Sequence, residues 1–208
     1  MIPRFQLYLF DVDGTLVDSA SDICGAIRSA LSETPHAGIE ESFLRTYIGR
    51  HLLELFADLF PDYTPEQIDA LIFDYRKIYL SRGHTMTSVY PGVVEGLAAL
   101  PGPKATATTK GTPTTRAVLE QFGLLPFFDH VQGTDGFPAK PAPDVILKSV
   151  DLFGVPKDQI LMVGDSPADM EAGKRAGVRT CAVTYGYGKQ PDLARHTPDY
   201  WLNDLREL

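Results

Sequence analysis

The second half of the chain alternates short apolar runs with stretches of helical spacing. Residues 159–164 (Gln-Ile-Leu-Met-Val-Gly) form the clearest buried strand, because a short apolar run bounded by turn residues is typical of a strand covered on both faces. Further strands are predicted at residues 7–10, 105–109, 130–134, 180–185 and 200–202, and helices at residues 91–100, 112–122, 143–153 and 167–176. This alternation predicts an α/β fold with a doubly wound, Rossmann-like parallel sheet.

Residues 16–86 follow a different pattern, because their apolar positions recur only at helical spacing. Four helices are predicted there, within residues 19–33, 43–48, 52–60 and 65–80. We expect no strand among them and place the return of the sheet near Ser88. The predicted organisation is therefore a core at residues 1–15 and 87–208 with an inserted four-helix domain at residues 16–86.

Three of the predicted core helices share the same start and stop signals. Each has a proline at its first position and a glycine just beyond its end, in the pairs Pro113 and Gly123, Pro143 and Gly154, Pro167 and Gly177. Because each of these helices begins after a strand or its loop, several helix N-termini should face one rim of the sheet. Their free N–H groups and partial positive charge favour the binding of anions such as phosphate.

Two carboxylates follow the first strand directly, in the hexapeptide Asp11-Val-Asp-Gly-Thr-Leu16. In open parallel sheets ligands bind beyond the carboxyl ends of the strands. Two carboxylates at the end of a buried strand are costly in an apolar core, but they are well placed to bind a ligand. The hexapeptide therefore predicts a nucleophile, an acid or base, and a metal ligand in one place.

Composition narrows the classes of partner. With 208 residues, a net charge of −8 and no run of Lys or Arg, the chain is not expected to bind nucleic acid. Cys24 and Cys181 match no metal spacing and are expected to be reduced thiols. Asp11 and Asp13 interrupt the only N-terminal apolar run, so we expect no signal peptide, no membrane association and a cytoplasmic protein, monomeric or weakly dimeric.

Four motifs, taken in order, resemble the haloacid dehalogenase (HAD) superfamily. They are the hexapeptide at Asp11, Thr108 at a strand end, Lys140 in Lys-Pro-Ala-Pro-Asp, and Gly164-Asp-Ser-Pro-Ala-Asp169. The resemblance covers essentially the whole chain, and the helical insertion is similar to the α-helical cap of that superfamily. It implies a hydrolase that transfers a phosphoryl group to an aspartate, with Mg²⁺ as the metal ion.

The resemblance gives each carboxylate a role that its chemistry suits. Asp11 would attack phosphorus to form an aspartyl-phosphate, and Asp13 would protonate the leaving group and then activate water. Asp11, Asp165 and the backbone carbonyl of Asp13 would bind Mg²⁺, which prefers oxygen ligands. Asp169 has two alternatives: a ligand of the metal through water, or a residue that caps its helix.

Cationic and hydroxyl side chains complete the predicted site. Lys140 would offset the negative charge of Asp11 and of the phosphoryl group in the transition state. Thr108 would hydrogen-bond the phosphoryl oxygens, and Thr109 and Lys110 beside it are further candidates for anion contacts. In the insertion, Gly49 and Arg50 form a candidate turn whose guanidinium could bind a substrate carboxylate; a solvated arginine is the alternative.

The substrate is the least determined part of the prediction. Residues 17–23 (Val-Asp-Ser-Ala-Ser-Asp-Ile) and 185–188 (Tyr-Gly-Tyr-Gly) resemble the phosphoglycolate phosphatase branch of the superfamily, which makes 2-phosphoglycolate the leading candidate among small phosphorylated metabolites. Alternatives within the superfamily are a pyrophosphatase, a sugar-phosphate phosphatase and a phosphomutase. From other classes, a phosphorylatable signalling module and a silent binding module also stay open.

Overall fold

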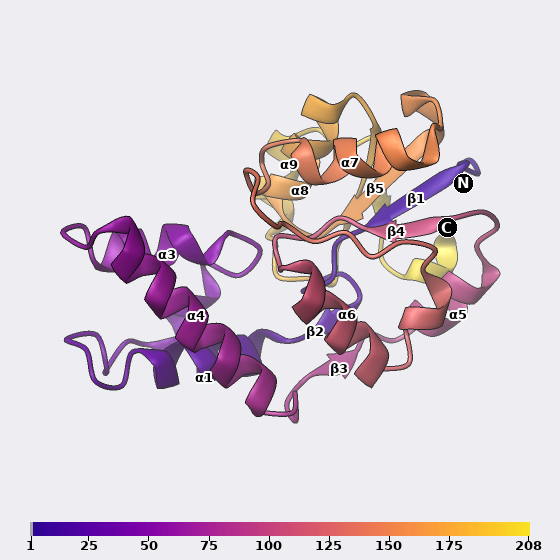
Figure 1. The fold of residues 1–208 in the computed structure, drawn as a ribbon. Coiled ribbons are helices and arrows are strands. Elements are labelled where there is room, and N and C mark those ends of the chain that lie inside the picture. Colours follow the sequence, from indigo (N-terminus) through magenta and orange to yellow (C-terminus); the bar gives the residue numbers. More distant parts are fainter. Residues whose placement is uncertain (1) are drawn as a thin grey trace. The chain divides into compact units, whose positions relative to one another are not determined.

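The computed structural model describes residues 2–208 and divides the chain into two compact units (Figure 1). The first unit contains the chain up to Asp18 together with Ser88–Leu208, and the second unit is Ser19–Thr87. Within residues 2–208, no helix is both long enough and apolar enough to cross a membrane.

A five-stranded parallel sheet forms the centre of the first unit. Its strand order is β4 (Lys104–Thr106), β1 (Leu7–Phe10), β5 (Ile160–Gly164), β6 (Arg179–Val183) and β7 (Tyr200–Leu202). In register, Tyr8 of β1 lies between Lys104 and Leu161. All residues of β1 and β5 are buried, as expected for apolar strands covered on both faces.

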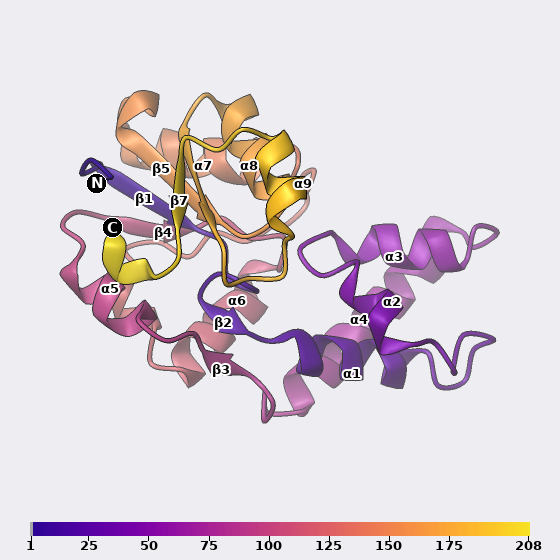
Figure 2. The same cartoon turned by 180° about the vertical axis from the view of Figure 1, so that it is seen from behind.

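Helices cover both faces of this sheet (Figures 1 and 2). On one face lie α7 (Asp144–Phe153) and α8 (Pro167–Ala176), and on the other lie α5 (Val93–Ala99) and α6 (Thr112–Gln121); α9 (Gln190–Arg195) packs beside α8. Short 3-10 turns occupy η1 (Leu125–Phe127), η2 (Lys157–Gln159) and η3 (Leu205–Glu207). The predicted doubly wound α/β fold is confirmed.

Helix boundaries follow the expected signals with two exceptions, at Pro113 and Pro143. Pro113 is the second residue of α6 and not its first. Gly154 and Gly177 end α7 and α8 in the left-handed conformation, which costs glycine no steric penalty. Pro167 lies in the first turn of α8. Pro143 is the residue before the first turn of α7 and not its first helical residue, so the prediction was wrong there by one position.

The strand order places β1 at the point where the chain reverses direction across the sheet. From β1 the chain continues to the neighbour on one side, β4, and only later to the neighbour on the other side, β5. Loops that leave in opposite directions open a crevice at the carboxyl end of such a strand, and ligands bind there in open α/β sheets. Asp11 is the first residue beyond β1.

Residues that leave and re-enter the first unit form a small sheet of their own. Strands β2 (Val17–Asp18) and β3 (Ser88–Val89) pair in antiparallel fashion, with Val17 opposite Val89. The prediction that the central sheet resumes near Ser88 was therefore wrong. The returning chain pairs with the departing chain, and the central sheet resumes only at Lys104.

The predicted strand at residues 130–134 is also wrong. Only one bridge, between Ala105 and His130, joins this segment to β4. The Thr106 hydroxyl accepts the Gln132 N–H at 2.8 Å and donates to the Gln132 carbonyl at 2.9 Å. A side chain thus takes the place of the next ladder hydrogen bonds, and the segment runs beside β4 without becoming a strand. Strand β4 itself ends at Thr106 and not at residue 109.

The second unit contains the four predicted helices, α1 (Ala20–Ala30), α2 (Glu41–Arg45), α3 (Leu52–Leu59) and α4 (Pro65–Ser81). Helix α4 packs against α1 and α3, and a capping box between Thr64 and Gln67 starts it. The buried Asp22 carboxylate accepts hydrogen bonds from the Met86 N–H at 2.9 Å and the Thr87 hydroxyl at 2.7 Å. These bonds join the first helix of the unit to its last residues.

Candidate active site

A tight turn after β1 carries the first two carboxylates. The Asp11 N–H donates to the Val163 carbonyl at 2.9 Å, which extends the pairing with β5 by one residue. Gly14 has a φ of +92°, a conformation that a side chain disfavours. Its N–H donates to the Val17 carbonyl at 2.9 Å. The turn therefore returns the chain within a few residues and keeps Asp11 and Asp13 at the carboxyl end of the sheet.

Lys140 joins three segments of the site through its ammonium group. Its Nζ donates to Asp11 Oδ1 at 2.9 Å, to the Ala107 carbonyl at 2.7 Å and to Asp169 Oδ1 at 2.5 Å. An ammonium group has three N–H donors, so all of them are used. The side chain is only 1% exposed. A buried charge of this kind is stable only because each donor has a partner.

Asp165 and Asp169 bring further negative charge to the same place. One carboxylate oxygen from each of Asp11, Asp165 and Asp169 lies within 4.8 Å of the others, and all three residues are buried. Asp165 follows β5, the strand beside β1. The structure therefore brings together carboxylates that lie more than 150 positions apart in the sequence.

Asp169 has protein partners for both of its carboxylate oxygens. Oδ1 pairs with Lys140, while Oδ2 accepts from the Ser166 N–H at 2.9 Å and the Ser166 hydroxyl at 2.6 Å. The second set of contacts is the capping box that starts α8. Asp169 thus connects the start of a helix to the ammonium group of Lys140.

Lys110 lies at the site and pairs with the second carboxylate of the hexapeptide. Its Nζ lies 3.3 Å from Asp13 Oδ2, and its side chain is 8% exposed. The turn that carries it is held by Thr108, whose Oγ1 accepts the Lys110 N–H at 3.3 Å. Thr134 supports the same turn by donating to the Thr108 carbonyl at 2.9 Å. Thr109 is half-buried between the two candidate residues.

The charges of this site do not cancel. When all four carboxylates (Asp11, Asp13, Asp165 and Asp169) are ionised, they outnumber the two ammonium groups (Lys110 and Lys140) by two charges, and with a proton on Asp13 they still outnumber them by one. A divalent cation with a preference for oxygen ligands fits such a deficit, and Mg²⁺ is the ion of this type that binds phosphate together with one or two carboxylates. The donor set of the site therefore fits Mg²⁺.

Burial and mutual repulsion shift the titration of these groups. Burial raises the pKa of Asp11 to about 6; Lys140 opposes the rise, and Asp169 and Asp13 add to it. Burial and the charges of Asp11 and Asp169 raise the pKa of Asp165 well above its usual value. For Lys140, burial favours the neutral amine, but the two carboxylates outweigh it and raise the pKa above the ordinary lysine value. In the absence of a metal ion, Asp11 and Asp165 therefore hold a proton more tightly than a free aspartate does.

Sequence reasoning missed two residues that hold Asp165. The Thr15 hydroxyl donates to Asp165 Oδ1 at 3.1 Å, and the Tyr187 N–H donates to Oδ2 at 2.8 Å. Thr15 lies within the hexapeptide, so its position at the strand end was a usable signal. The contact from Tyr187 is made by the backbone, and nothing in a side-chain pattern reveals it.

Gly49 and Arg50 lie in the second unit. Gly49 has a φ of +87°, as expected for a turn. The Arg50 guanidinium pairs with Glu54 at 2.6 Å and lies over the Tyr47 ring, 4.5 Å from its centre. Their predicted contact with substrate stays a prediction.

Comparison with known proteins agrees with this geometry. The sequence model of the haloacid dehalogenase-like hydrolase family matches residues 8–183. The phosphoglycolate phosphatase of Aquifex aeolicus is 34% identical over 210 residues, which cover 98% of this chain and 94% of that protein. Phosphoglycolate phosphatase 1 of Pseudomonas aeruginosa is also 34% identical and is matched over 100% of this chain and 79% of its own length. The solved structure of a haloacid dehalogenase-like family hydrolase from Streptococcus pneumoniae superimposes with a TM-score of 0.86 at 28% identity, over 98% of this chain and 96% of that one.

Proposed function

Because the chain belongs to the haloacid dehalogenase-like hydrolase family and is a phosphatase, we propose that it hydrolyses a small phosphomonoester through a phosphoryl group carried on Asp11. The observation that carries this proposal is the geometry of Lys140, which bridges Asp11 and Asp169 inside a rim of four carboxylates. The Lys140 ammonium opposes protonation of Asp11 and orients its carboxylate at the topological switch point of the sheet.

In the first step Asp11 acts as the nucleophile. Lys140 engages its Oδ1, and Oδ2 has no hydrogen-bond partner among residues 2–208, so Oδ2 is the oxygen available for attack. As the new bond from Oδ2 to phosphorus forms, the bond from phosphorus to the ester oxygen breaks. Asp13 gives its proton to the leaving alcohol oxygen.

In the second step water attacks the same phosphorus atom. Asp13, now ionised, accepts a proton from this water, and the bond between phosphorus and Asp11 breaks to release inorganic phosphate. Lys140 stays paired with Asp11 through both steps, so the carboxylate leaves as a stabilised anion. Asp13 returns to its protonated form, ready for the next substrate.

Asp11, Asp165 and the backbone carbonyl of Asp13 are the proposed ligands of Mg²⁺. Asp165 suits this role because its two oxygens are each held by one donor, Thr15 or Tyr187, and each retains a lone pair. We assign Asp169 to Lys140 and to the start of α8. When bound, Mg²⁺ supplies positive charge that lets a carboxylate approach a phosphate dianion.

Around the phosphoryl group we assign Thr108, Thr109 and Lys110 to its oxygens, and Gly49 with Arg50 to the rest of the substrate. The names of the relatives from Aquifex aeolicus and Pseudomonas aeruginosa support 2-phosphoglycolate as the first candidate. Its carboxylate is the kind of group that an arginine binds with two parallel hydrogen bonds.

The test is phosphate release by the purified protein with Mg²⁺. The substrate panel contains 2-phosphoglycolate, pyrophosphate, sugar phosphates, nucleotides and a neutral phosphomonoester. We expect the highest kcat/KM for 2-phosphoglycolate and no turnover after chelation with EDTA. Absence of turnover on every phosphomonoester would overturn the proposal, and preference for pyrophosphate would overturn the substrate class.

A further inference from the structure

Residues 185–188 (Tyr-Gly-Tyr-Gly), which we name the strap, enter the chemistry proposed above only through the N–H of Tyr187. The strap follows β6 and passes directly against Asp165, the proposed metal ligand. The N–H of Tyr187 is one of only two hydrogen-bond donors that the residues 2–208 direct at the Asp165 carboxylate. The strap therefore helps to set the direction in which that carboxylate points.

The two glycines of the strap are required by its closeness to Asp165. A Cβ atom on Gly186 would lie 2.3 Å from the Asp165 Cβ and 2.4 Å from the Gly14 carbonyl oxygen. On Gly188 it would lie 1.9 Å from the Asp165 carbonyl oxygen. Real side chains do not approach so closely, so only glycine lets the backbone lie against the metal ligand.

The two tyrosines hold the strap to the segment that follows the hexapeptide. The Tyr185 hydroxyl donates to the Thr15 carbonyl at 2.9 Å, and the Tyr187 hydroxyl donates to Asp18 Oδ1 at 3.0 Å. Asp18 ends β2, where the chain leaves the first unit. The Tyr185 ring also packs against Tyr90, just beyond β3, with ring centres 4.9 Å apart.

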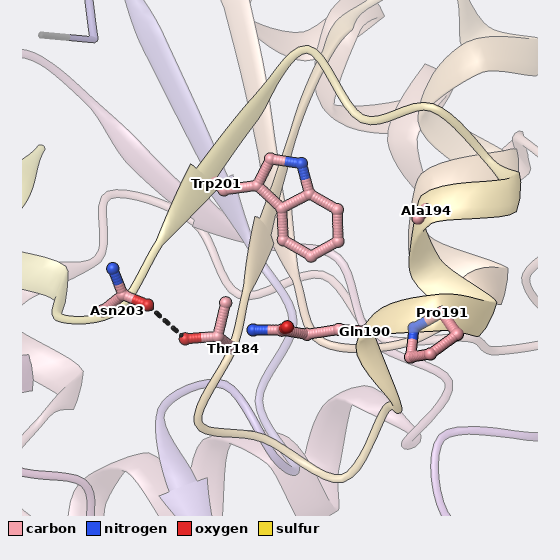
Figure 3. Close-up of a pocket in the computed structure, with 6 residues that line it drawn as sticks. All are labelled: Thr184, Gln190, Pro191, Ala194, Trp201 and Asn203. Atoms are coloured by element: carbon pink, nitrogen blue, oxygen red, sulfur yellow. Dashed lines mark hydrogen bonds between the residues drawn. The ribbon is translucent and has the colours of Figure 1, made fainter.

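The two ends of the strap differ in their contacts: Thr184 before it is hydrogen-bonded, and Gln190 beyond it borders a pocket. Thr184, before the strap, donates its N–H to the Leu202 carbonyl at 2.9 Å and its hydroxyl to Asn203 Oδ1 at 2.8 Å. Beyond the strap, Gln190 borders a cavity of about 460 Å³ that also lies against Thr184 and Trp201 (Figure 3). The strap itself is held by the tyrosine hydrogen bonds to Thr15 and Asp18.

We propose that Tyr187 is a positioning residue for the metal site: its phenol, anchored on Asp18, holds the strap so that its own N–H orients Asp165 for Mg²⁺. The inference rests on the proposed function, because it assigns Mg²⁺ to Asp165. It extends that function by linking the metal ligand to β2, the strand through which the chain enters the helical unit.

The test measures Mg²⁺ affinity by titration calorimetry on the metal-free full chain, so that turnover is not the only readout. Tyr187→Phe and Asp18→Ala should each weaken binding by about 3- to 10-fold, at the low end of what partners of metal ligands contribute. The Tyr187 side chain also hydrogen-bonds Tyr90, so the double variant is compared with Tyr187→Phe. It should bind no more weakly than Tyr187→Phe, because the hydrogen bond that Asp18→Ala removes is already lost in that variant. Asp18→Asn keeps an acceptor oxygen and should restore affinity to within about twofold of the unaltered protein.

Gly186→Ala is a second way to disturb the strap and should weaken Mg²⁺ binding by about 10- to 100-fold, since its Cβ would displace the strap from Asp165. Tyr200→Phe is the matched control, because it removes a phenol of the same unit that has no hydrogen-bond partner among residues 2–208. Its Mg²⁺ affinity should be unchanged. Thermal unfolding without Mg²⁺ identifies any variant that is not folded.

Each outcome bears on one proposal or the other. Unchanged Mg²⁺ affinity in folded Tyr187→Phe, or additive losses in the double variant, would overturn the role of Tyr187. If the unaltered protein binds Mg²⁺ and the strap variants bind it more weakly, but no phosphomonoester is hydrolysed, the positioning role of Tyr187 is supported and the proposed function is overturned. If the unaltered protein does not bind Mg²⁺, the inference fails with the metal assignment. For an active enzyme, the Mg²⁺ concentration for half-maximal turnover should rise in Tyr187→Phe by the same factor as the dissociation constant.

Discussion

Two ion pairs, one from each unit of this protein, differ in what surrounds them. The pair between Lys140 and Asp11 has side chains only 1% and 3% exposed, and its ammonium group has three partners. The pair between Arg50 and Glu54 lies at the exposed start of α3, with side chains 44% and 37% exposed. A buried charge must be compensated by named partners, whereas an exposed one is compensated by water.

Because of this difference, the effect of a substitution can be derived from the contacts of a buried charge more readily than from those of an exposed one. In the first unit, removal of one partner leaves another charge buried and uncompensated, so each residue of the carboxylate rim has a defined effect. In the second unit, an exposed pair such as Arg50 with Glu54 contributes little to stability. The predictions that follow compare the two cases, from the largest effect to the smallest.

Asp11→Asn should have the largest effect on activity. The amide keeps the shape of the carboxylate and loses the nucleophilic oxygen anion, so kcat should fall by at least about 1,000-fold. The measurement is phosphate release from the best substrate of the panel, with far-UV circular dichroism as the check on folding. Asp151→Asn, an exposed substitution on α7, is the control and should retain full activity. A turnover within tenfold of the unaltered protein would contradict the role of Asp11.

Lys140→Met should have the largest effect on stability, a loss of about 3–5 kcal/mol in the free energy of unfolding at pH 8. The substitution keeps the length of the side chain and leaves Asp11 and Asp169 without their cation. The loss should shrink as the pH falls to 5. Burial raises the folded-state pKa of Asp11 to about 6 even with Lys140 present, so acid protonates this carboxylate in the folded protein before the unfolded one.

The check is denaturant unfolding of Lys140→Met and the unaltered protein at pH 5 and pH 8. Lys148→Met is the matched control, since Lys148 is exposed and lies over the Phe137 ring; its effect should stay below about 1 kcal/mol at both pH values. An equal loss for Lys140→Met at pH 5 and pH 8 would show that packing, and not charge, explains the cost.

Lowering the pH should weaken Mg²⁺ binding, by a smaller factor than the loss of kcat in Asp11→Asn. The metal binds the ionised carboxylate, so protons compete for Asp11 once the pH falls below its pKa of about 6. At pH 5 only about one-tenth of a group with this pKa is ionised, which predicts about tenfold weaker binding than at pH 7.5. Titration calorimetry at the two pH values measures this. Constant affinity would contradict the assignment of Asp11 as a ligand.

Arg50→Ala should have the smallest effect on stability, below about 0.5 kcal/mol, because it removes only an exposed ion pair. The effect of Arg50→Ala on KM is more informative than its effect on stability. If Arg50 binds the substrate carboxylate, KM for 2-phosphoglycolate rises and KM for a neutral phosphomonoester does not. Arg45→Ala, which breaks a similar exposed pair with Glu41, is the control. Identical KM values in the two variants would exclude Arg50 from the substrate site.

Two carboxylates of the site could be predicted because each directly follows a recognisable strand. Asp11 and Asp165 come directly after β1 and β5, two buried apolar strands that prove to be neighbours. Parallel strands bring their carboxyl ends to one edge, so sequence position was enough to bring these carboxylates together. The pairing of Lys140 with both Asp11 and Asp169 could not be predicted from the sequence and is seen only in the structure.

Other parts could not be predicted, for physical reasons. The segment at residues 130–134 has the pattern of a strand, but the Thr106 hydroxyl takes the hydrogen bonds that a ladder would need. Strands β2 and β3 each contain two residues, too few for a periodic pattern. The contact from Tyr187 to Asp165 is made by a backbone N–H, which every residue except proline carries.

The most direct test of the central claim is a crystal structure of the protein with Mg²⁺ and trifluoroberyllate, a stable analogue of a phosphoryl group. The account predicts a bond from beryllium to a carboxylate oxygen of Asp11, Lys140 still paired with Asp11, and Mg²⁺ held by Asp11 and Asp165. Beryllium on any other residue, or Mg²⁺ bound away from Asp165, would contradict it.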